Sequence, residues 1–310
     1  MVVDNFRPSS QDRQETKRGF RLLWALVGTL LLGICIAVVA VMYEMKTSWL
    51  QARELSRYAG TLTYALKEGA SDTIMYPDNG PFDKRLGYAQ LPQLIDRAKL
   101  HGMHVTHQTR FSPALMDFAS HGYFIPYREK TQAGLNIMDS QGKNVYHSPY
   151  PKRVYPDFDS VPQLITQSLL FIEDRELLDT KKLNINTARV WGRVTKTVMH
   201  QAARAIGLNY ETIGGSTLPT QIEKYRHSPA GLTMSPEAKL KQMISASVRT
   251  YQAGALTLPA RKNLVLSYEN TEPLSGAPGN VEVHGLGDGL WVWCVAELEQ
   301  VNKLLRLHNT

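Results

Sequence analysis

"GGSTLPTQIEKY", residues 214–225, is typical of a loop that runs into a helix. Two glycines come first, Ser216 and Thr217 are candidate N-caps, and Pro219 suits the first turn. Free N–H groups at a helix N-terminus, together with the helix dipole, favour a bound phosphate or another anion. Lys224 adds a positive charge further along the same helix. Two interpretations are open at this point, an anion site or a plain helix cap.

Further helices are expected on both sides of this stretch. Residues 235–254 have the clearest signals, because Ser235 suits an N-cap, Pro236 the first turn and Gly254 the C-terminal stop. Other helical patterns cover residues 161–177, residues 184–207 and the stretch that begins at Pro259 and ends before "TEPLSGAPGN".

Strand signals are limited to one short region. The sequence "GLNIMDSQGKNVYHS", residues 134–148, predicts two strands around a turn. Asp139 and Gly142 stand at the ends of that turn, where type I turns prefer them. We therefore expect a mainly α protein with a small α+β region before the main helices.

An apolar run near the N-terminus predicts a membrane anchor. Residues 22–43 carry no charge, and a bilayer core needs about 20 residues. A cleaved signal peptide is the alternative, but its apolar region usually has only about 7–15 residues. Basic residues before the run place the N-terminus in the cytoplasm by the positive-inside rule. These are Arg7, Arg13, Lys17, Arg18 and Arg21. We expect a cytoplasmic tail at 1–20, one transmembrane helix at 21–43 and an exported remainder.

Residues 44–133 are expected to form an exported linker or accessory region. Apolar residues recur at helical spacing over residues 44–68, which predicts a helix that leaves the membrane. A loop, "YPDNGPFDK", follows this pattern. The main domain is then expected over residues 134–310.

Composition narrows the class of partner. Lys and Arg (35) outnumber Asp and Glu (28), so the net charge is +7 and the isoelectric point is near 9.3. This balance favours anionic partners such as lipid headgroups and phosphates. Export of the main domain argues against nucleic acid. The two cysteines, Cys35 and Cys294, cannot form a disulfide framework.

"SLLFIEDREL", residues 168–177, places Glu173 and Asp174 directly after an apolar run. A partly desolvated carboxylate at such an edge suits a general acid or base. The alternative is a helix whose exposed face carries ordinary solvated charges.

Other site types receive little support from the sequence. The histidines at 101, 104 and 107 are three residues apart, and this spacing does not bring them to one face of a helix or strand. No GxSxG motif is present, so the nucleophile elbow of serine hydrolases is not expected.

Three stretches in this order resemble the lysozyme-like peptidoglycan glycosyltransferases, the transglycosylase module of penicillin-binding proteins and their monofunctional relatives. The stretches are "FIEDREL", then "GGSTLPTQIEK", then "AKLKQMISASVR" leading to "ARKNLVLSYEN". The resemblance covers about residues 134–300, and the single N-terminal anchor fits it as well.

The resemblance implies a hexosyltransferase with a lysozyme-like fold outside the cytoplasmic (inner) membrane. Such an enzyme polymerises lipid II into glycan strands, with undecaprenyl pyrophosphate as the leaving group. Lipid II, glycan strands and membrane lipids would be its ligands, and other cell-wall synthesis proteins would be further partners. No cofactor is required by this resemblance, although a divalent cation is compatible with it.

The resemblance also assigns roles to individual residues. Glu173 takes the position of the catalytic base, which deprotonates the 4-hydroxyl of the acceptor sugar. Lys224 falls near the pyrophosphate. The implied substrate-binding set is Asp174, Gly215, Ser216, Thr217, Gln221, Lys224, Lys239, Gln242, Arg261 and Asn270.

Several positions depart from the family pattern. After the Glu–Asp pair the family usually has Phe, His and Gly, while Leu177, Thr180 and Lys182 stand here. Thr220 replaces the first of two glutamines, and Gln242 stands where the family has a second essential glutamate. The family would also continue for a helix or two beyond residue 310. Two alternatives therefore accompany the glycosyltransferase expectation. One is a degenerate module that binds precursor or glycan or scaffolds a cell-wall complex, and the other is a glycan-cleaving enzyme.

Overall fold

The computed structural model describes residues 10–75, 80–131, 134–148, 153–188, 216–279 and 281–307. These described residues are mainly helical, with 56% of them in helices and 10% in strands. The expected mainly α class is therefore confirmed at this level. The chain divides into two units, Met1–Ser48 and Trp49–Thr310.

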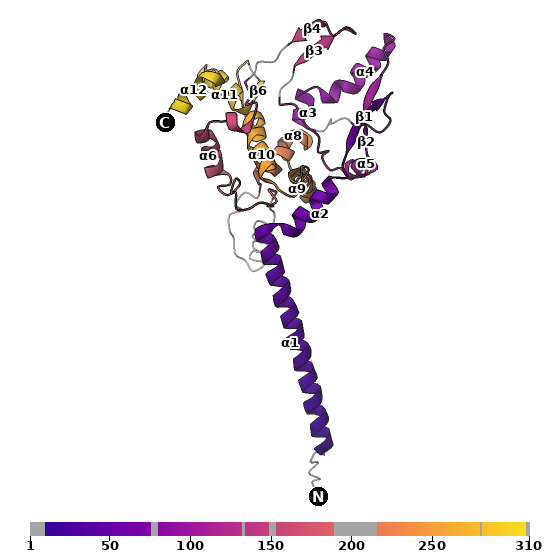
Figure 1. Ribbon diagram of the computed structural model, residues 1–310, viewed down its shortest axis with the longest axis vertical. Helices are drawn as coiled ribbons and strands as arrows, with labels where there is room; N and C mark the ends of the chain where they lie inside the picture. Colours follow the sequence, from indigo (N-terminus) through magenta and orange to yellow (C-terminus); the bar gives the residue numbers. More distant parts are fainter. Residues whose placement is uncertain are drawn as a thin grey trace. The chain divides into compact units, whose positions relative to one another are not determined.

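The first unit contains the helix α1, Ser10–Thr47 (Figure 1). Its segment Leu23–Thr47 is long and apolar enough to cross a membrane by length and composition. Twenty-five helical residues span about 37 Å, more than the ~30 Å of a hydrocarbon core. The hydroxyls of Thr29 and Thr47 donate to backbone carbonyls one turn earlier, so these polar groups are satisfied within the helix.

The helix predicted over residues 44–68 is wrong in its second half. After α1, helix α2 covers only Trp49–Ala59, and Tyr64–Glu68 form strand β1 instead. Strand β1 pairs antiparallel with β2, His107–Phe111. Pairing with a segment some forty residues away overrides the local helical pattern, and this is a contact that periodicity does not detect.

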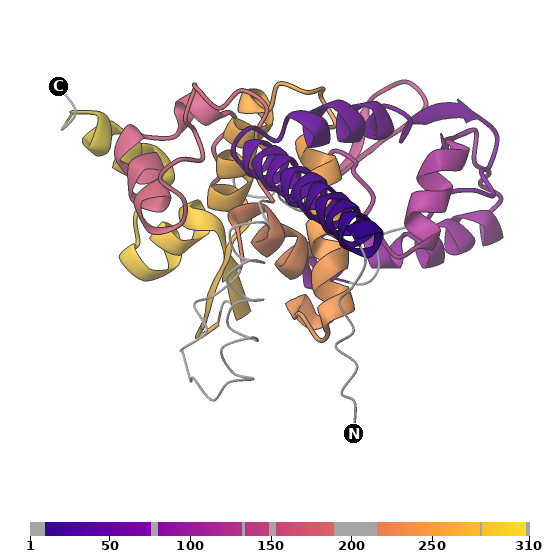
Figure 2. The same ribbon diagram turned by 90° about the horizontal axis from the view of Figure 1, so that it is seen from below.

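Helices dominate the second unit, with α8, α9 and α10 side by side near its middle (Figures 1 and 2). Helices α11 and α12 lie to one side of this group and α4 and α5 to the other (Figure 2). The bounds are α3 Pro81–Arg85, α4 Leu91–Leu100, α5 Pro113–Ser120, α6 Gln163–Ile172, α8 Leu218–His227, α9 Pro236–Thr250, α10 Leu258–Thr271, α11 Gly285–Cys294 and α12 Leu298–Leu307.

Two more antiparallel pairs accompany the β1–β2 pair. Strands β3, Leu135–Met138, and β4, Asn144–Ser148, form the predicted hairpin, and its turn is closed by a hydrogen bond from the Gly142 N–H to the Asp139 carbonyl at 3.0 Å. The Asp139 carboxylate also accepts from the Gln141 N–H. The pair β5, Pro273–Ala277, and β6, Val281–His284, follows α10.

Helix starts agree closely with the capping signals. The Ser235 hydroxyl accepts a hydrogen bond from the Ala238 N–H, so Ser235 caps α9 as predicted. Thr217 is the N-cap of α8, and its own N–H donates to the Thr220 hydroxyl at 2.9 Å. The helix predicted over residues 184–207 and the glycines 214 and 215 lie outside the described residues, apart from positions 184–188.

Helix ends were harder to predict from the sequence. Helix α9 stops at Thr250, four residues before Gly254, because Tyr251 turns inward and its hydroxyl donates to the Asn184 carbonyl. Helix α6 ends at Ile172. Glu173 is therefore the C-cap of α6 and not part of its exposed face.

Buried apolar clusters join distant segments. Ala59, Leu62, Leu115, Phe118 and Val248 form one cluster, so residues 59–62 share a core with α9. Two other clusters are centred on Tyr155, Val161 and Leu298, and on Leu177, Leu218 and Val265. The third cluster packs α10 and the first turn of α8 beneath the chain that follows Glu173.

Helix α8 also buries charge. Arg226 contacts Glu129 at 2.5 Å, and the His227 Nε2 atom lies 2.8 Å from a Glu129 oxygen. Arg249 of α9 bonds Glu223 at 2.7 Å and lies 3.4 Å from Glu129. The side chains of Glu129 and Glu223 are 3% and 1% exposed, so nearly all of their charge must be balanced inside the protein.

Gly80→Ala is expected to destabilise this unit by about 2–3 kcal/mol. A Cβ atom at Gly80 would lie 1.6 Å from the Arg226 carbonyl oxygen on α8, and backbone atoms cannot move aside cheaply. Gly60→Ala is the matched control, because its Cβ would meet its nearest atoms at 3.4 Å. Urea unfolding followed by circular dichroism measures both free energies. Equal stability of the two variants would contradict the close approach of Gly80 to α8.

Candidate functional site

Glu173 belongs to a hydrogen-bonded relay across three elements. One Glu173 carboxylate oxygen accepts from the Gln221 side-chain amide at 2.9 Å. The carbonyl oxygen of the same amide accepts from the Tyr268 hydroxyl at 3.1 Å. The relay links the end of α6, the first turns of α8 and the second half of α10, and it brings Glu173 and Gln221 together.

The backbone around Glu173 is fixed on both sides. The Glu173 N–H donates to the Leu169 carbonyl at 2.9 Å, and the Asp174 N–H donates to the Leu170 carbonyl. The Asp174 carboxylate accepts from the Glu176 N–H at 3.0 Å, which closes a turn directly after Glu173. Asp174 thus shapes the loop, and Glu173 remains half-buried rather than fully solvated.

Two basic residues are associated with α8, Lys239 next to its start and Lys224 within the helix. The Lys239 ammonium group, from the first turn of α9, donates to the Ser216 hydroxyl at 2.8 Å. Lys224 is half-buried on α8, and among the described residues no hydrogen bond or ion pair holds its ammonium group. Gln221 and Lys224 are three residues apart and therefore share one face of the helix. Gly215 lies outside the described residues.

Arg261 is too deeply buried to contact a substrate directly. Its side chain is fully buried, and its guanidinium donates to the carbonyls of Leu177, Asp179 and Lys182 at 2.8, 3.0 and 2.6 Å. These carbonyls belong to the loop that follows Glu173. Arg261 therefore fixes that loop, and any effect on a ligand would act through the loop.

Asn270 has a similar structural position. Its side-chain oxygen accepts from the Tyr155 N–H at 2.8 Å, and its amide donates to the Tyr155 carbonyl at 2.9 Å. The side chain is buried. Both hydrogen-bonding groups of the amide are thus used to hold the chain at Tyr155 against α10.

Gln242 is enclosed between α9 and the turn after α8. Its side chain is 0% exposed, and its amide donates to the hydroxyls of Ser228 and Thr233 at 2.9 and 3.0 Å. The Thr233 hydroxyl also lies 3.2 Å from the Gln242 carbonyl oxygen. A neutral amide with these partners is well satisfied, and the site has no counter-charge among these contacts.

Gln242→Glu is expected to destabilise the protein by about 2–3 kcal/mol, because it would place a carboxylate in a fully buried, neutral surrounding. The sequence resemblance alone would suggest instead that a glutamate here restores a site charge. Thermal unfolding at pH 7 and at pH 5 tests the physical reason, since protonation of the new carboxyl at low pH should recover part of the loss. Gln300→Glu on exposed α12 is the control and should change stability by less than about 0.5 kcal/mol.

Two acidic residues near the relay were not singled out from the sequence. Burial raises the pKa of Glu269 to about 7. Burial, together with the Glu269 charge, raises the pKa of Glu272 to about 8. Burial and the charges of Glu272 and Glu173 raise the pKa of the Tyr268 hydroxyl, so this phenol feels both carboxylates. Glu269 in the last turn of the predicted helix and Glu272 just beyond its end were the available signal, because carboxylates are disfavoured at a helix C-terminus.

Glu272 is held in place by its backbone. Its N–H donates to the Tyr268 carbonyl at 2.8 Å, and its carbonyl accepts from the Gly285 N–H at 2.8 Å. Gly285 has a φ of +76°, and a Cβ there would lie 2.4 Å from the Asn270 carbonyl oxygen. A glycine is therefore required at this contact, which fixes the end of α10.

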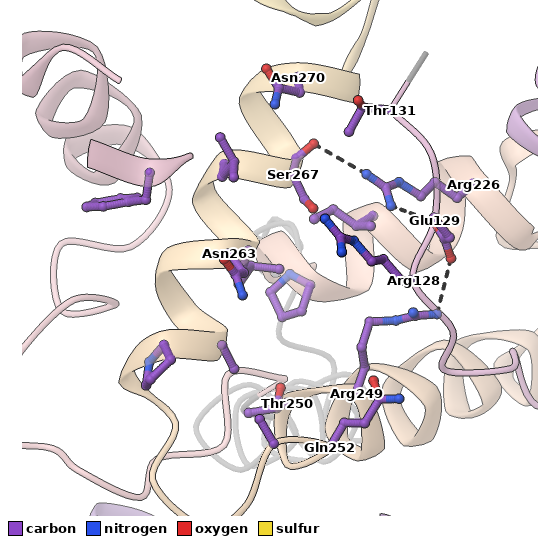
Figure 3. A pocket seen from close by; sticks show the side chains of 18 of the residues that line it. Arg128, Glu129, Thr131, Arg226, Arg249, Thr250, Gln252, Asn263, Ser267 and Asn270 are labelled. Atoms are coloured by element: carbon purple, nitrogen blue, oxygen red, sulfur yellow. Dashed lines mark hydrogen bonds and ion pairs between the residues drawn. The ribbon is translucent and has the colours of Figure 1, made fainter. Parts of the chain in front are cut away.

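A cavity of about 1030 Å³ lies on another side of α8 (Figure 3). Glu173, Gln221 and Tyr268 are absent from its described lining. Within the described residues, no group of three or more His, Cys, Asp or Glu side chains is arranged to hold a metal ion. The histidines at 101, 104 and 107 are exposed.

The sequence was also compared with known proteins. Neither a scan against protein-family models nor a search of curated proteins finds a match.

Proposed function

We propose that residues 134–310 form a divergent, lysozyme-like peptidoglycan glycosyltransferase domain, held at the outer face of the cytoplasmic membrane by α1. The supporting observation is the hydrogen bond between Glu173 and Gln221, at 2.9 Å. It joins two of the sequence stretches that carry the resemblance, although they are 48 residues apart in the chain.

In the proposed reaction Glu173 is the general base. Its carboxylate takes the proton from the 4-hydroxyl of the acceptor sugar as that oxygen attacks the anomeric carbon of the donor. The new glycosidic C–O bond forms while the bond from the anomeric carbon to the pyrophosphate oxygen breaks, and the pyrophosphate keeps the electron pair. Lys224 and the Lys239–Ser216 pair supply positive charge for that leaving group.

Gln221 and Tyr268 act as positioning residues in this proposal. Gln221 donates to Glu173, which leaves the second carboxylate oxygen of Glu173 for the acceptor hydroxyl. Tyr268 in turn fixes the orientation of the Gln221 amide, because its hydroxyl donates to the amide oxygen. Such a chain restricts the rotamers of the base before substrate arrives.

Polymerisation of labelled lipid II by the full chain in detergent or liposomes tests the proposal. Glycan strands longer than a disaccharide, together with release of undecaprenyl pyrophosphate, are the expected products. If lipid II binds but is not polymerised, the protein is a module that binds the precursor and not an enzyme. If lipid II neither binds nor is polymerised, both functions are rejected.

A glycan-cleaving reaction is the second candidate, and Glu272 favours it. A carboxyl group whose pKa is raised to about 8 is protonated at neutral pH and can donate a proton to a glycosidic oxygen. Glu173 would be the second carboxyl group of such a reaction, since the charges of both glutamates act on the Tyr268 hydroxyl. Incubation with preformed glycan strands discriminates the two reactions, since only cleavage yields shorter strands and new reducing ends.

A further inference from the structure

The cavity of about 1030 Å³ is separate from the Glu173 relay, as the faces of α8 show. Pro219, Ile222 and Arg226 line the cavity. At about 100° per residue these positions form one stripe along the helix, and Gln221 and Lys224 lie on the opposite stripe. A ligand in the cavity would therefore contact the side of α8 that faces away from the relay.

Helix α10 contributes a broad arc to the cavity, including Ala260, Asn263, Leu264 and Ser267. Tyr268, which belongs to the relay, is absent from the described lining, although Leu264, one turn earlier, belongs to it. Arg226 fills the space between α8 and α10, because its guanidinium donates to the Thr271 hydroxyl and the Ser267 carbonyl.

Most of the charge in the cavity wall is already balanced. Arg226 is paired with Glu129, and Arg249 is paired with Glu223 and Glu129. Lys130 lies over the ring of Tyr88, 5.9 Å from its centre. These basic groups are therefore committed to contacts within the protein.

Arg128 differs from the other basic residues of the wall. Within the described part of the chain, no hydrogen bond or ion pair holds its guanidinium, and the residue is exposed. Figure 3 shows Arg128 reaching from the segment 127–131 into the pocket, toward α10. The described lining holds four basic and three acidic side chains, Asp157 among the latter, so its net charge is +1, and Arg128 supplies a group with five N–H donors.

The remaining wall is suited to an apolar or ring-shaped body. Aromatic and aliphatic side chains come from several segments, with the exposed amide of Asn263 among them. The apolar members include Tyr64, Tyr155, Phe158, Ile222, Pro259 and Leu264. Half of the described lining residues are apolar, and apolar surface beside polar groups that fix orientation is usual in small-molecule sites.

We propose that this cavity binds a small anion in which a carboxylate or phosphate group, held by Arg128, is attached to an apolar or ring-shaped body. Arg forms paired N–H···O hydrogen bonds with a planar carboxylate and with a tetrahedral phosphate. What the two groups share is a pair of negatively charged acceptor oxygens. The site is independent of the glycosyltransferase proposal, because no residue of the Glu173 relay contributes to its described lining.

Binding of small fluorinated probes to the full chain in detergent tests this site by ¹⁹F NMR. The probes are 4-fluorobenzoate, 4-fluorophenyl phosphate and the neutral 4-fluorobenzamide. We expect at least one of the two anions to bind and the amide to bind at least about 10-fold more weakly, because it lacks the charge that Arg128 pairs with. The tighter of the two anions identifies the natural head group as carboxylate or phosphate.

Two variants and one control locate the binding. Arg128→Ala should weaken anion binding by about 10- to 100-fold, as expected for a charge-assisted hydrogen bond. Ala260→Trp should remove binding by filling the cavity from α10. Arg97→Ala removes an exposed arginine from α4 and should change nothing. Unchanged affinity in Arg128→Ala, equal binding of the amide, or no binding of either anion at about 10 mM would each overturn the proposal.

Discussion

Glu173→Gln is expected to lower lipid II polymerisation by about 100- to 10,000-fold while the protein stays folded, because general-base assistance usually contributes this much. A glutamine has nearly the shape of glutamate, and its carbonyl oxygen can still accept from Gln221, whose amide now bonds Glu173 at 2.9 Å. The loss would therefore come from proton transfer and not from a collapsed relay. The measurement is the initial rate of glycan formation, with circular dichroism as the folding check.

Glu176→Gln is the control for this experiment. Glu176 is three residues away, its side chain is 62% exposed, and it pairs with Lys182 at the surface. Removal of such a surface charge should change the rate less than about twofold. If Glu173→Gln keeps more than about a tenth of the wild-type rate, Glu173 is not the base. The loss would then be less than about tenfold, whereas loss of a general base should cost at least about 100-fold.

Local signals predicted much of the fold. Ser235 caps α9 and the turn from Asp139 to Gly142 joins two strands, because both features depend on hydrogen bonds within a few residues. Strand β1 was missed for the opposite reason. Its hydrogen bonds are made with β2, and nothing within residues 64–68 distinguishes that pairing from one more helical turn.

The candidate site could be predicted only in part. The resemblance selected both Glu173 and Gln221 as site residues, and a hydrogen bond joins them in the structure. Burial, by contrast, is a tertiary property. Arg261 looks like a ligand for anions in the sequence, yet it is fully enclosed by three carbonyls of the loop after Glu173.

The same limit applies to the charge network around α8. Glu129 and Arg226 are 97 residues apart, and no local pattern pairs them. Charged side chains such as those of Glu223, Arg226 and His227 are seldom fully buried in proteins. The structure buries all three, each less than a tenth exposed. Their burial is possible because Glu129 and Arg249 arrive from other segments with opposite charge.

Glu129→Gln is expected to destabilise the protein by about 3–5 kcal/mol at pH 7, because it removes one member of a buried ion network and leaves the others unpaired. Glu129 contacts Arg226, His227 and Arg249. Its own pKa is held well below the usual range, because those three positive groups outweigh the cost of burial. Glu237→Gln, at a side chain that is 74% exposed, is the control and should cost less than about 1 kcal/mol.

The pH dependence of stability identifies the mechanism. Burial alone would lower the pKa of His227, but the Glu129 charge and contacts with Asp83 and Glu223 raise it to about 9, from 6.5. The charged imidazole therefore stabilises the native state below about pH 6.5, and this contribution is lost as the pH rises through about 9. Glu269 and Glu272 have pKa values raised to near 7 and 8, so their ionisation also lowers the unfolding free energy as the pH rises. This effect is the same in wild type and in Glu129→Gln.

The difference in unfolding free energy between wild type and Glu129→Gln therefore reports on the titration of His227. Unfolding free energies of the full chain in detergent, measured from pH 6 to about 9.5, should fall more steeply in wild type than in Glu129→Gln, since loss of the carboxylate returns the pKa of His227 toward its ordinary value. The gap between the two curves should accordingly narrow as the pH increases. Parallel curves over this range would mean that His227 is already neutral at pH 7, and that Glu129 stabilises the fold only through Arg226 and Arg249.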